Sequence, residues 1–181
     1  MKVIILAAGY GTRLGELTKN KPKPIIEIAG KPIIAYIIER LHLHGITEII
    51  VNIHYLPAEI YNYLGGHVLY SYEQKLLGHR GTILSLRNWL KDDNFFVING
   101  DTLTDLNYSE MIAQYKDGSI MVAMDEWRAI GSWIYSKEYF SNENLPVVPY
   151  RPSDLHWFDT GTPQRLEDAR RYFENDSTSS S

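Results

Sequence analysis

Three continuous apolar segments, each followed by a helical pattern, constrain the fold of this chain more than any other feature. They cover residues 3–6, 49–53 and 95–98. Strands that are apolar on both faces are typical of parallel sheets covered by helices on both sides. The intervening patterns predict helices at 33–41, between Pro32 and Gly45, and at 57–64. The alternation predicts an α/β fold with a doubly wound, mostly parallel, Rossmann-like sheet in a single domain.

Weaker patterns extend this assignment toward the C-terminus. They predict strands at 68–72, 120–124 and 130–135, and helices at 82–90, around Met111 and from Pro163 onward. Residues 142–152 are rich in proline and polar side chains, which favours a loop. We therefore expect one domain over residues 1–174. The last residues, 175–181, are mostly serine and threonine and are expected to form a disordered tail.

The first apolar segment ends abruptly at glycines and is followed by a cluster of cations. Gly9 and Gly11 allow backbone N–H groups to approach phosphate oxygens closely, because no Cβ is in the way. Arginine supplies a two-pronged donor and lysine a point charge. Four cations follow within a short stretch, namely Arg13, Lys19, Lys21 and Lys23, and prolines restrict the chain on both sides of Lys23. This segment therefore predicts a site for a polyanion.

The spacing of this segment excludes two common phosphate-binding motifs. A G-x-G-x-x-G dinucleotide fingerprint requires glycine at position 14, which is Leu14. A Walker A loop requires G-x-x-x-x-G-K-[ST], and the chain has Leu14-Gly15-Glu16 instead. The glycine segment therefore belongs to some other phosphate site.

Composition narrows the classes of protein further. The chain has 181 residues, a net charge of −4 and no cysteine. The acidic balance argues against general nucleic-acid binding, and the missing cysteine excludes disulfides, thiolate nucleophiles and zinc-thiolate sites. No stretch reaches membrane-spanning length. We expect a soluble, cytoplasmic protein whose basic residues form a local site.

Asp101 ends an apolar strand and should lie at the same sheet edge as Gly9. Ligands of doubly wound sheets bind beyond the carboxyl ends of the strands. A carboxylate there is costly to bury unless a cation pairs with it, and magnesium bound to phosphates is one suitable partner. From the residues alone, a turn aspartate that caps the following segment explains Asp101 equally well.

At this point a family resemblance becomes specific. The motif LAAG-x-GTRL, followed by PKP and by AGKPII over residues 29–34, resembles the signature of sugar-phosphate nucleotidyltransferases, the NDP-sugar pyrophosphorylases. The match is unbroken from residue 1 to about 41, and weaker matches recur at 99–101 and 158–163. The resemblance implies magnesium-dependent transfer of a nucleotide from an NTP to a sugar 1-phosphate, with release of pyrophosphate.

The resemblance also implies roles for individual residues. Arg13 would hold the departing pyrophosphate, and Lys23 would contact the α-phosphate. Asp101 and Asp159, the latter in a D-x-G-T-P segment, would be the Mg²⁺ ligands. The catalytic residues are then Arg13, Lys23 and Asp101. Further substrate-binding residues are expected at Leu6, Ala7, Ala8, Gly9, Gly11, Thr12, Gly78, Arg80 and Gly100.

The chain departs from the family pattern in two places. Where relatives read L-G-T-x-G-A, this chain has bulkier His79 and Arg80, which fit either substrate contacts or an exposed loop. The E-K-P motif, whose lysine grips the acceptor phosphate, is missing, so the acceptor region is expected to be trimmed. Candidates to replace that lysine are Arg80, Arg128 and Arg151. Trp127, Trp133 and Trp157 either line an acceptor pocket or belong to the core, and no histidine metal site is expected.

Three hypotheses of function therefore remain. The first is synthesis of an NDP-sugar; the second is nucleotide transfer to a small phosphoester such as phosphocholine. The third is a non-catalytic subunit that binds a nucleotide and regulates a partner. The expected ligands are an NTP and a phosphorylated small molecule, without nucleic acid or membrane, and the chain is open to oligomerisation. The base and the acceptor are not predicted.

Overall fold

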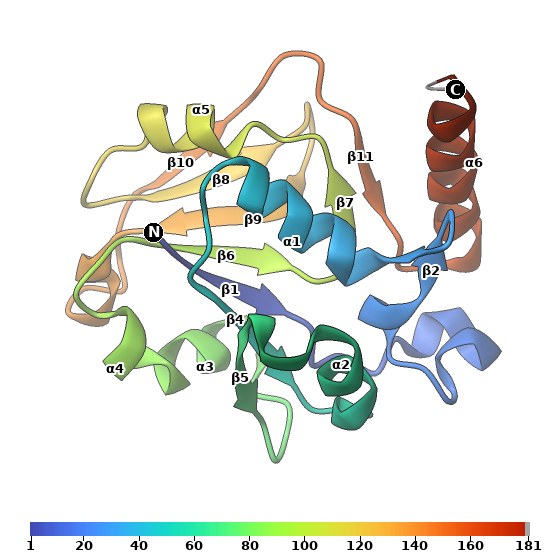
Figure 1. Cartoon of the computed structure of the whole chain (residues 1–181). Coiled ribbons are helices and arrows are strands. Elements are labelled where there is room, and N and C mark those ends of the chain that lie inside the picture. Colours follow the sequence, from blue (N-terminus) through green and yellow to red (C-terminus); the bar gives the residue numbers. More distant parts are fainter. Residues whose placement is uncertain (180–181) are drawn as a thin grey trace.

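The computed structural model describes residues 1–179, and one seven-stranded sheet organises them (Figure 1). The strand order is β10-β8-β9-β6-β1-β4-β5, and all neighbouring pairs are parallel except those of β9 with β6 and β8. The predicted doubly wound, mostly parallel α/β fold is therefore confirmed. The strands are β1 (Lys2–Leu6), β4 (Ile49–Ile53), β5 (Leu69–Tyr72), β6 (Phe95–Asn99), β8 (Ile120–Met124), β9 (Ala129–Tyr135) and β10 (Val147–Tyr150).

The order in which the strands are connected creates a crevice at the middle of the sheet. Helix α1 (Ile33–Leu43) leads from β1 to its neighbour β4, and α2 (Pro57–Leu64) leads from β4 to β5. The chain then returns through α3 (Gly78–Ser85) and α4 (Arg87–Leu90) to β6, on the other side of β1. Such a reversal opens a ligand crevice beyond the carboxyl ends of the two central strands. Gly9 follows β1 and Asp101 follows β6, so both lie at this crevice.

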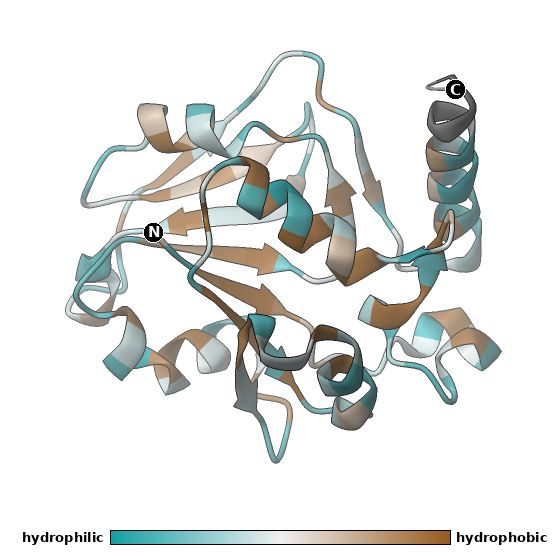
Figure 2. Cartoon of the chain, in the orientation of Figure 1, coloured by the Kyte–Doolittle hydropathy of each residue, from teal (hydrophilic) through white to brown (hydrophobic). Residues whose placement is uncertain are grey.

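Each face of the sheet carries its own apolar core. Along β1, Val3 and Ile5 pack with α1, α2, α5 (Tyr108–Gln114) and α6 (Pro163–Ser179), whereas Ile4 packs with α3, α4 and the 3₁₀ turn Lys137–Phe140. This alternation is the two-residue period of a strand that is buried on both faces. Figure 2 accordingly shows the central strands as strongly hydrophobic, while α6 is largely hydrophilic.

One prediction was wrong at the edge of the sheet. Residues 142–152, expected to form a loop, contain β10, which pairs with β8 in parallel. Proline usually disfavours strands, but it is tolerated where its missing N–H faces no partner strand. Pro149 lies on an edge strand with only one neighbour, so it costs no hydrogen bond of the ladder.

The helix expected at 82–90 is divided into two. Helix α3 begins earlier, at Gly78, and the helical backbone is interrupted at Leu86 before α4 begins. The Ser85 hydroxyl donates to the carbonyl of Thr82 at 2.8 Å. Such a side-chain bond competes with the helical ladder and favours a bend. The other predicted helices agree closely with the structure; α2 covers 57–64 as expected.

Two short antiparallel ribbons lie outside the main sheet. The first joins β2 (Glu27–Ile28) to β3 (Lys31–Pro32), and the second joins β7 (Thr102–Thr104) to β11 (Trp157–Asp159). The remaining short elements are the 3₁₀ turns Thr12–Thr18, Lys23–Ile25 and Gly65–His67. Helix α6 continues through residues 175–179 of the segment expected to be a disordered tail, and residues 180–181 lie outside the described part. Within residues 1–179, no helix is long and apolar enough to cross a membrane.

Candidate active site

The glycine segment after β1 is held in one shape by local hydrogen bonds. Gly11 adopts the left-handed region, with φ of 66°, and its carbonyl accepts from Leu14 N at 2.9 Å and from Thr18 Oγ1 at 3.1 Å. The Tyr55 hydroxyl donates to the carbonyls of Thr18 and Lys19, each at 2.9 Å. Glycine is favoured at position 11 because other residues rarely adopt this φ. Hydrogen bonds within the protein therefore set the shape of this segment.

Lys23 is a buried cation aimed into the site. Its side chain is only 8% exposed, and its Nζ donates to Asp101 Oδ2 at 2.6 Å. Pro22 and Pro24 fix the backbone on both sides, as the sequence suggested, and Lys23 starts a 3₁₀ turn. A buried ammonium requires such a partner because an unpaired charge is expensive to desolvate. Lys23 and Asp101 therefore hold each other at the crevice.

The β7–β11 ribbon brings the two predicted metal ligands together, although they are far apart in sequence. Asp159 pairs in register with Thr102, the residue that follows Asp101. Thr160 then donates to the Asp101 carbonyl twice, through its N–H at 3.1 Å and its hydroxyl at 2.8 Å. Asp159 itself accepts from Gly161 N at 2.8 Å and is ion-paired with Arg165. Both carboxylates consequently reach the rim of one hollow.

Two adjoining hollows share this rim. The glycine hollow, of about 220 Å³, gathers most of the residues predicted to bind substrate and is lined by Leu6, Ala7, Gly9, Gly11, Thr12, Arg13, Lys23, Pro24, Gly100, Asp101 and Gly161. The hairpin hollow, of about 180 Å³, is lined by Arg13, Asn99, Asp101, Thr102, Arg128, Ala129, Ile130, Gly131, Trp157 and Asp159. Arg13 and Asp101 border both. The arrangement offers room for two neighbouring ligands with charged groups between them.

Gly161 leaves space for Arg13 to approach the second carboxylate. A Cβ at position 161 would lie 2.6 Å from Asp159 Oδ1 and 2.8 Å from a terminal nitrogen of Arg13. Any side chain at this position would therefore push the arginine or the carboxylate away. The glycine of the D-x-G-T-P segment thus allows Arg13 and Asp159 to share one small region of the site.

A buried polar network supports the glycine hollow, and the sequence analysis did not identify it. Asn52 accepts from Ala7 N at 2.6 Å and donates to Glu73 Oε1 at 2.9 Å. Glu73, only 3% exposed, also accepts from Thr82 Oγ1 at 2.5 Å and from Leu77 N at 3.1 Å. These bonds tie the backbone after β1 to the segment before α3. The sequence holds one hint of this network, because Asn52 is a polar residue within the otherwise apolar segment 49–53.

His79 and Arg80, which depart from the family pattern, line neither the glycine hollow nor the hairpin hollow. Arg80 is exposed and is ion-paired with Glu143. His79 is packed edge-on against Trp133, with ring centroids 4.7 Å apart, and its Nε2 lies 3.0 Å from the Tyr135 hydroxyl. Burial lowers the pKa of His79 from its ordinary value. Gly78 begins α3, and Ala8 is buried beside the glycine hollow.

Asp101 and Asp159 form a donor set suited to magnesium. Mg²⁺ is usually held by one or two carboxylates, with substrate oxygens and water completing its six ligands. Among residues 1–179, no group of three or more histidine, aspartate or glutamate side chains is placed to hold a metal by itself. A pair of carboxylates on the rim of a hollow fits a magnesium site in which the substrate and water supply the remaining ligands.

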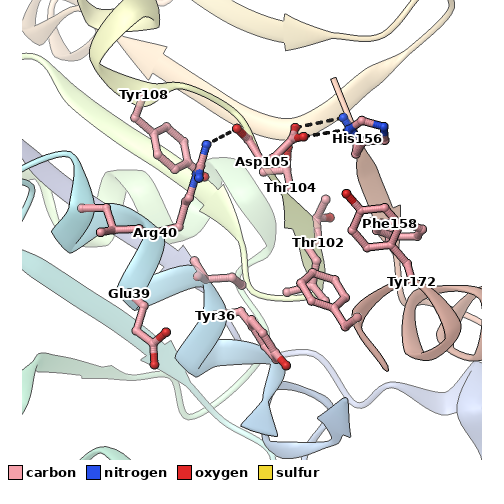
Figure 3. A pocket seen from close by; sticks show the side chains of 14 residues that line it. Tyr36, Glu39, Arg40, Thr102, Thr104, Asp105, Tyr108, His156, Phe158 and Tyr172 are labelled. Atoms are coloured by element: carbon pink, nitrogen blue, oxygen red, sulfur yellow. Dashed lines mark hydrogen bonds and ion pairs between the residues drawn. The ribbon is translucent and has the colours of Figure 1, made fainter. Parts of the chain in front are cut away.

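A further hollow, of about 260 Å³, lies between α1, the β7–β11 ribbon and α6 (Figure 3). Its aromatic wall includes Tyr36, Phe158 and Tyr172, and Arg40 and His156 both point toward Asp105. Arg40 donates to the Asp105 carbonyl, and His156 Nδ1 lies 2.8 Å from the Asp105 carboxylate. Because these polar groups already satisfy one another, and no predicted phosphate ligand lines this hollow, the glycine and hairpin hollows are the candidate active site.

Comparisons with known proteins agree with this geometry. The model of the Nucleotidyl transferase family matches residues 2–129. The mannose-1-phosphate guanylyltransferase catalytic subunit beta of Dictyostelium discoideum is 36% identical over 151 residues, which are 76% of this chain and 42% of that protein. The chain spans less than half the length of the curated relatives that it matches.

Solved structures show the same fold at lower identity. A putative glucose-1-phosphate thymidylyltransferase from Bacillus anthracis, crystallised with sucrose, superimposes with a TM-score of 0.82 at 20% identity, covering 95% of this chain and 94% of that one. HddC from Yersinia pseudotuberculosis, crystallised with GMP-PN, gives a TM-score of 0.81 at 22% identity, covering 95% and 99%.

Proposed function

Because this chain belongs to the Nucleotidyl transferase family, we propose that it transfers a nucleoside monophosphate from an NTP to a sugar 1-phosphate. The products are an NDP-sugar and pyrophosphate. The observation that carries this proposal is the pair of adjoining hollows with Arg13 and Asp101 on their shared border. The glycine hollow supplies backbone and cationic groups for a triphosphate, and the hairpin hollow offers space for the acceptor.

The proposed reaction is a single displacement at phosphorus. An oxygen of the acceptor phosphate attacks the α-phosphorus of the NTP, and the bond from that phosphorus to the bridging oxygen breaks. The bond electrons leave with pyrophosphate, so no nucleophile from the protein is required. Catalysis then consists of positioning and charge neutralisation. The absence of cysteine is consistent with such a reaction.

The residues of the glycine hollow have distinct roles in this reaction. The N–H groups near Gly9 and Gly11 contact the nucleotide, and Arg13 neutralises the departing pyrophosphate. Lys23 faces the α-phosphate, where negative charge spreads over the non-bridging oxygens in the transition state. Asp101 and Asp159 would hold Mg²⁺, which when bound offsets phosphate charge.

The relatives suggest which substrates to test first. The matched curated proteins are named mannose-1-phosphate guanylyltransferases, and one structural neighbour was crystallised with GMP-PN. GTP and mannose 1-phosphate are therefore our first substrate pair. These names describe longer proteins, of which the match covers less than half, so the pair is a proposal for this chain.

Release of pyrophosphate tests the proposed function directly. The assay combines four NTPs with several sugar 1-phosphates and with phosphocholine, in the presence of magnesium. We expect release with a sugar 1-phosphate and one preferred NTP. Release with phosphocholine alone would replace the sugar acceptor with a small phosphoester. Nucleotide binding without release for any pair would favour a non-catalytic binding subunit.

A further inference from the structure

The turn between β8 and β9 holds an arginine in a fixed position beside the hairpin hollow. The Asp125 carboxylate accepts from Trp127 N at 2.8 Å and from Arg128 N at 2.7 Å, and Asp125 N donates to the Arg128 carbonyl at 3.1 Å. These two backbone N–H groups lower the pKa of Asp125, so its carboxylate stays charged at neutral pH. These hydrogen bonds therefore fix the backbone position of Arg128.

An aromatic ring holds the guanidinium of Arg128 in place, and the N–H donors of this group are not used in hydrogen bonds within residues 1–179. It lies over the ring of Trp157, with its central carbon 4.5 Å from the ring centroid. Its contact with Asp125 is loose, at 3.8 Å, and its side chain is 54% exposed. Stacking on an aromatic ring fixes the plane of an arginine and leaves its N–H edge open to a carboxylate or phosphate.

The charges around Arg128 suggest an anion as its missing partner. Of the other cations at the site, Lys23 is paired with Asp101 and Arg165 with Asp159, while Arg13 borders both hollows. Arg128 shares the hairpin hollow with Asp101 and Asp159, the carboxylates that these two cations pair with. It also lines a neighbouring hollow of about 270 Å³ with Trp157, Asp159 and Arg165. Of the arginines suggested by the sequence, Arg80 is instead ion-paired with Glu143 on the surface.

We propose that Arg128, supported by Trp157, binds the phosphate of the acceptor. The inference rests on the proposed nucleotidyl transfer and adds the residue that receives the second substrate. A planar guanidinium offers two parallel N–H donors to a phosphate, which fixes both its position and its orientation. Arg128 thereby fills the role for which the chain has no E-K-P lysine. Trp157 acts as a positioning residue for Arg128.

Steady-state kinetics of two variants test this assignment. We expect Arg128→Ala to raise KM for mannose 1-phosphate by ~10–100-fold, the scale of a lost charge-assisted hydrogen bond, and to leave KM for GTP within ~2-fold. Arg128→Lys should fall between, because it keeps the charge but loses the fork. The matched control is Arg87→Ala, which removes an exposed arginine that also lies over an aromatic ring, that of Phe140. It should change neither KM.

Binding measurements separate this inference from the proposed function. Mannose 1-phosphate and inorganic phosphate are titrated calorimetrically into wild type and Arg128→Ala, with and without an α,β-methylene analogue of GTP. If wild type turns over but the variant keeps its KM for the acceptor, Arg128 is not the ligand and the function stands. If wild type binds mannose 1-phosphate through Arg128 without turnover, the function fails and the inference stands. The absence of both turnover and Arg128-dependent binding would reject both.

Discussion

The glycine hollow and the hairpin hollow adjoin one another but are built in opposite ways. Most of the glycine hollow comes from one continuous segment, residues 6–24, whose turns are closed by their own hydrogen bonds. The hairpin hollow is assembled from side chains on β6, β7, β9, β11 and the turn before β9. The cation of the first, Lys23, is buried and paired; that of the second, Arg128, is half exposed and stacked on an aromatic ring.

Under the proposed function, the glycine hollow binds the triphosphate and the hairpin hollow binds the acceptor, and the two constructions suit these ligands. A triphosphate is the same in every NTP, so a rigid backbone cradle with a fixed lysine suits it. An acceptor varies in shape, and side chains borne by several strands can change without disturbing the cradle. The substitutions below test how far the two hollows are independent.

Asp101 borders both hollows, so its replacement should have the largest effect. We expect Asp101→Asn to lower kcat by ~10³-fold or more, the scale seen when a charge-stabilising group is removed from phosphoryl transfer. The asparagine can still accept a hydrogen bond from Lys23, so the fold should persist, as far-ultraviolet circular dichroism would show. Asp105→Asn, four residues along and paired with His156, is the control. Near-normal turnover of Asp101→Asn would falsify its role as a metal ligand.

Lys23 is the buried cation of the glycine hollow, and its replacement tests whether its position matters for catalysis. We expect Lys23→Met to lower kcat by ~10²-fold, because the charge that develops on the α-phosphate loses its nearest cation. Lys21→Met is the matched control, since Lys21 is exposed and pairs only with Glu27. Steady-state pyrophosphate release measures both. Equal losses in the two variants would mean that general positive charge, and not the position of Lys23, drives the reaction.

Glu73 tests whether the buried network supports the cradle. In Glu73→Gln, an amide NH₂ replaces an oxygen that accepts from Asn52, Thr82 or Leu77, so two donors face each other. We expect the free energy of unfolding to fall by ~1–3 kcal/mol, measured in urea, and KM for GTP to rise. KM for the acceptor should change less. The exposed Glu59→Gln on α2 is the control, and an equal effect there would exclude a special role for the network.

His79 should produce the smallest effect, visible only as a pH dependence. Burial lowers its pKa below the ordinary value of 6.5, so the unfolded chain binds a proton more readily than the folded one. The stability that neutral His79 contributes is complete above pH 6.5 and is lost as the pH falls through the window below it. We expect His79→Gln to flatten the fall of Tm between pH 6.5 and 5, measured by calorimetry.

The control for this pH effect is His42→Gln, since His42 is exposed near the end of α1 and lines neither hollow. An unchanged pH slope in His79→Gln would show that the contact of His79 with Tyr135 and Trp133 does not depend on the neutral ring.

Local sequence specified the central strands, the main helices and the glycine segment, but not β10 or the β7–β11 ribbon. The apolar runs 3–6, 49–53 and 95–98 form strands buried on both faces of the sheet. The left-handed turn at Gly11 is closed by hydrogen bonds from the nearby Leu14 and Thr18. The turn after β1 can therefore be predicted from the local sequence. The loop expected at 142–152 shows the limit of local patterns, because Pro149 is tolerated only through its place at the sheet edge.

The distant residues of the site are brought together by the fold. Thr160 meets Asp101, and Asn52 meets Glu73, through pairings between segments that no local pattern specifies. Arg80, Arg128 and Arg151 are all candidate phosphate ligands in the sequence. The fold stacks Arg128 on Trp157 at the hairpin hollow and pairs Arg80 with Glu143 on the surface. Local sequence fixes backbone shape, whereas the surroundings of a charged side chain depend on which strands the fold places side by side.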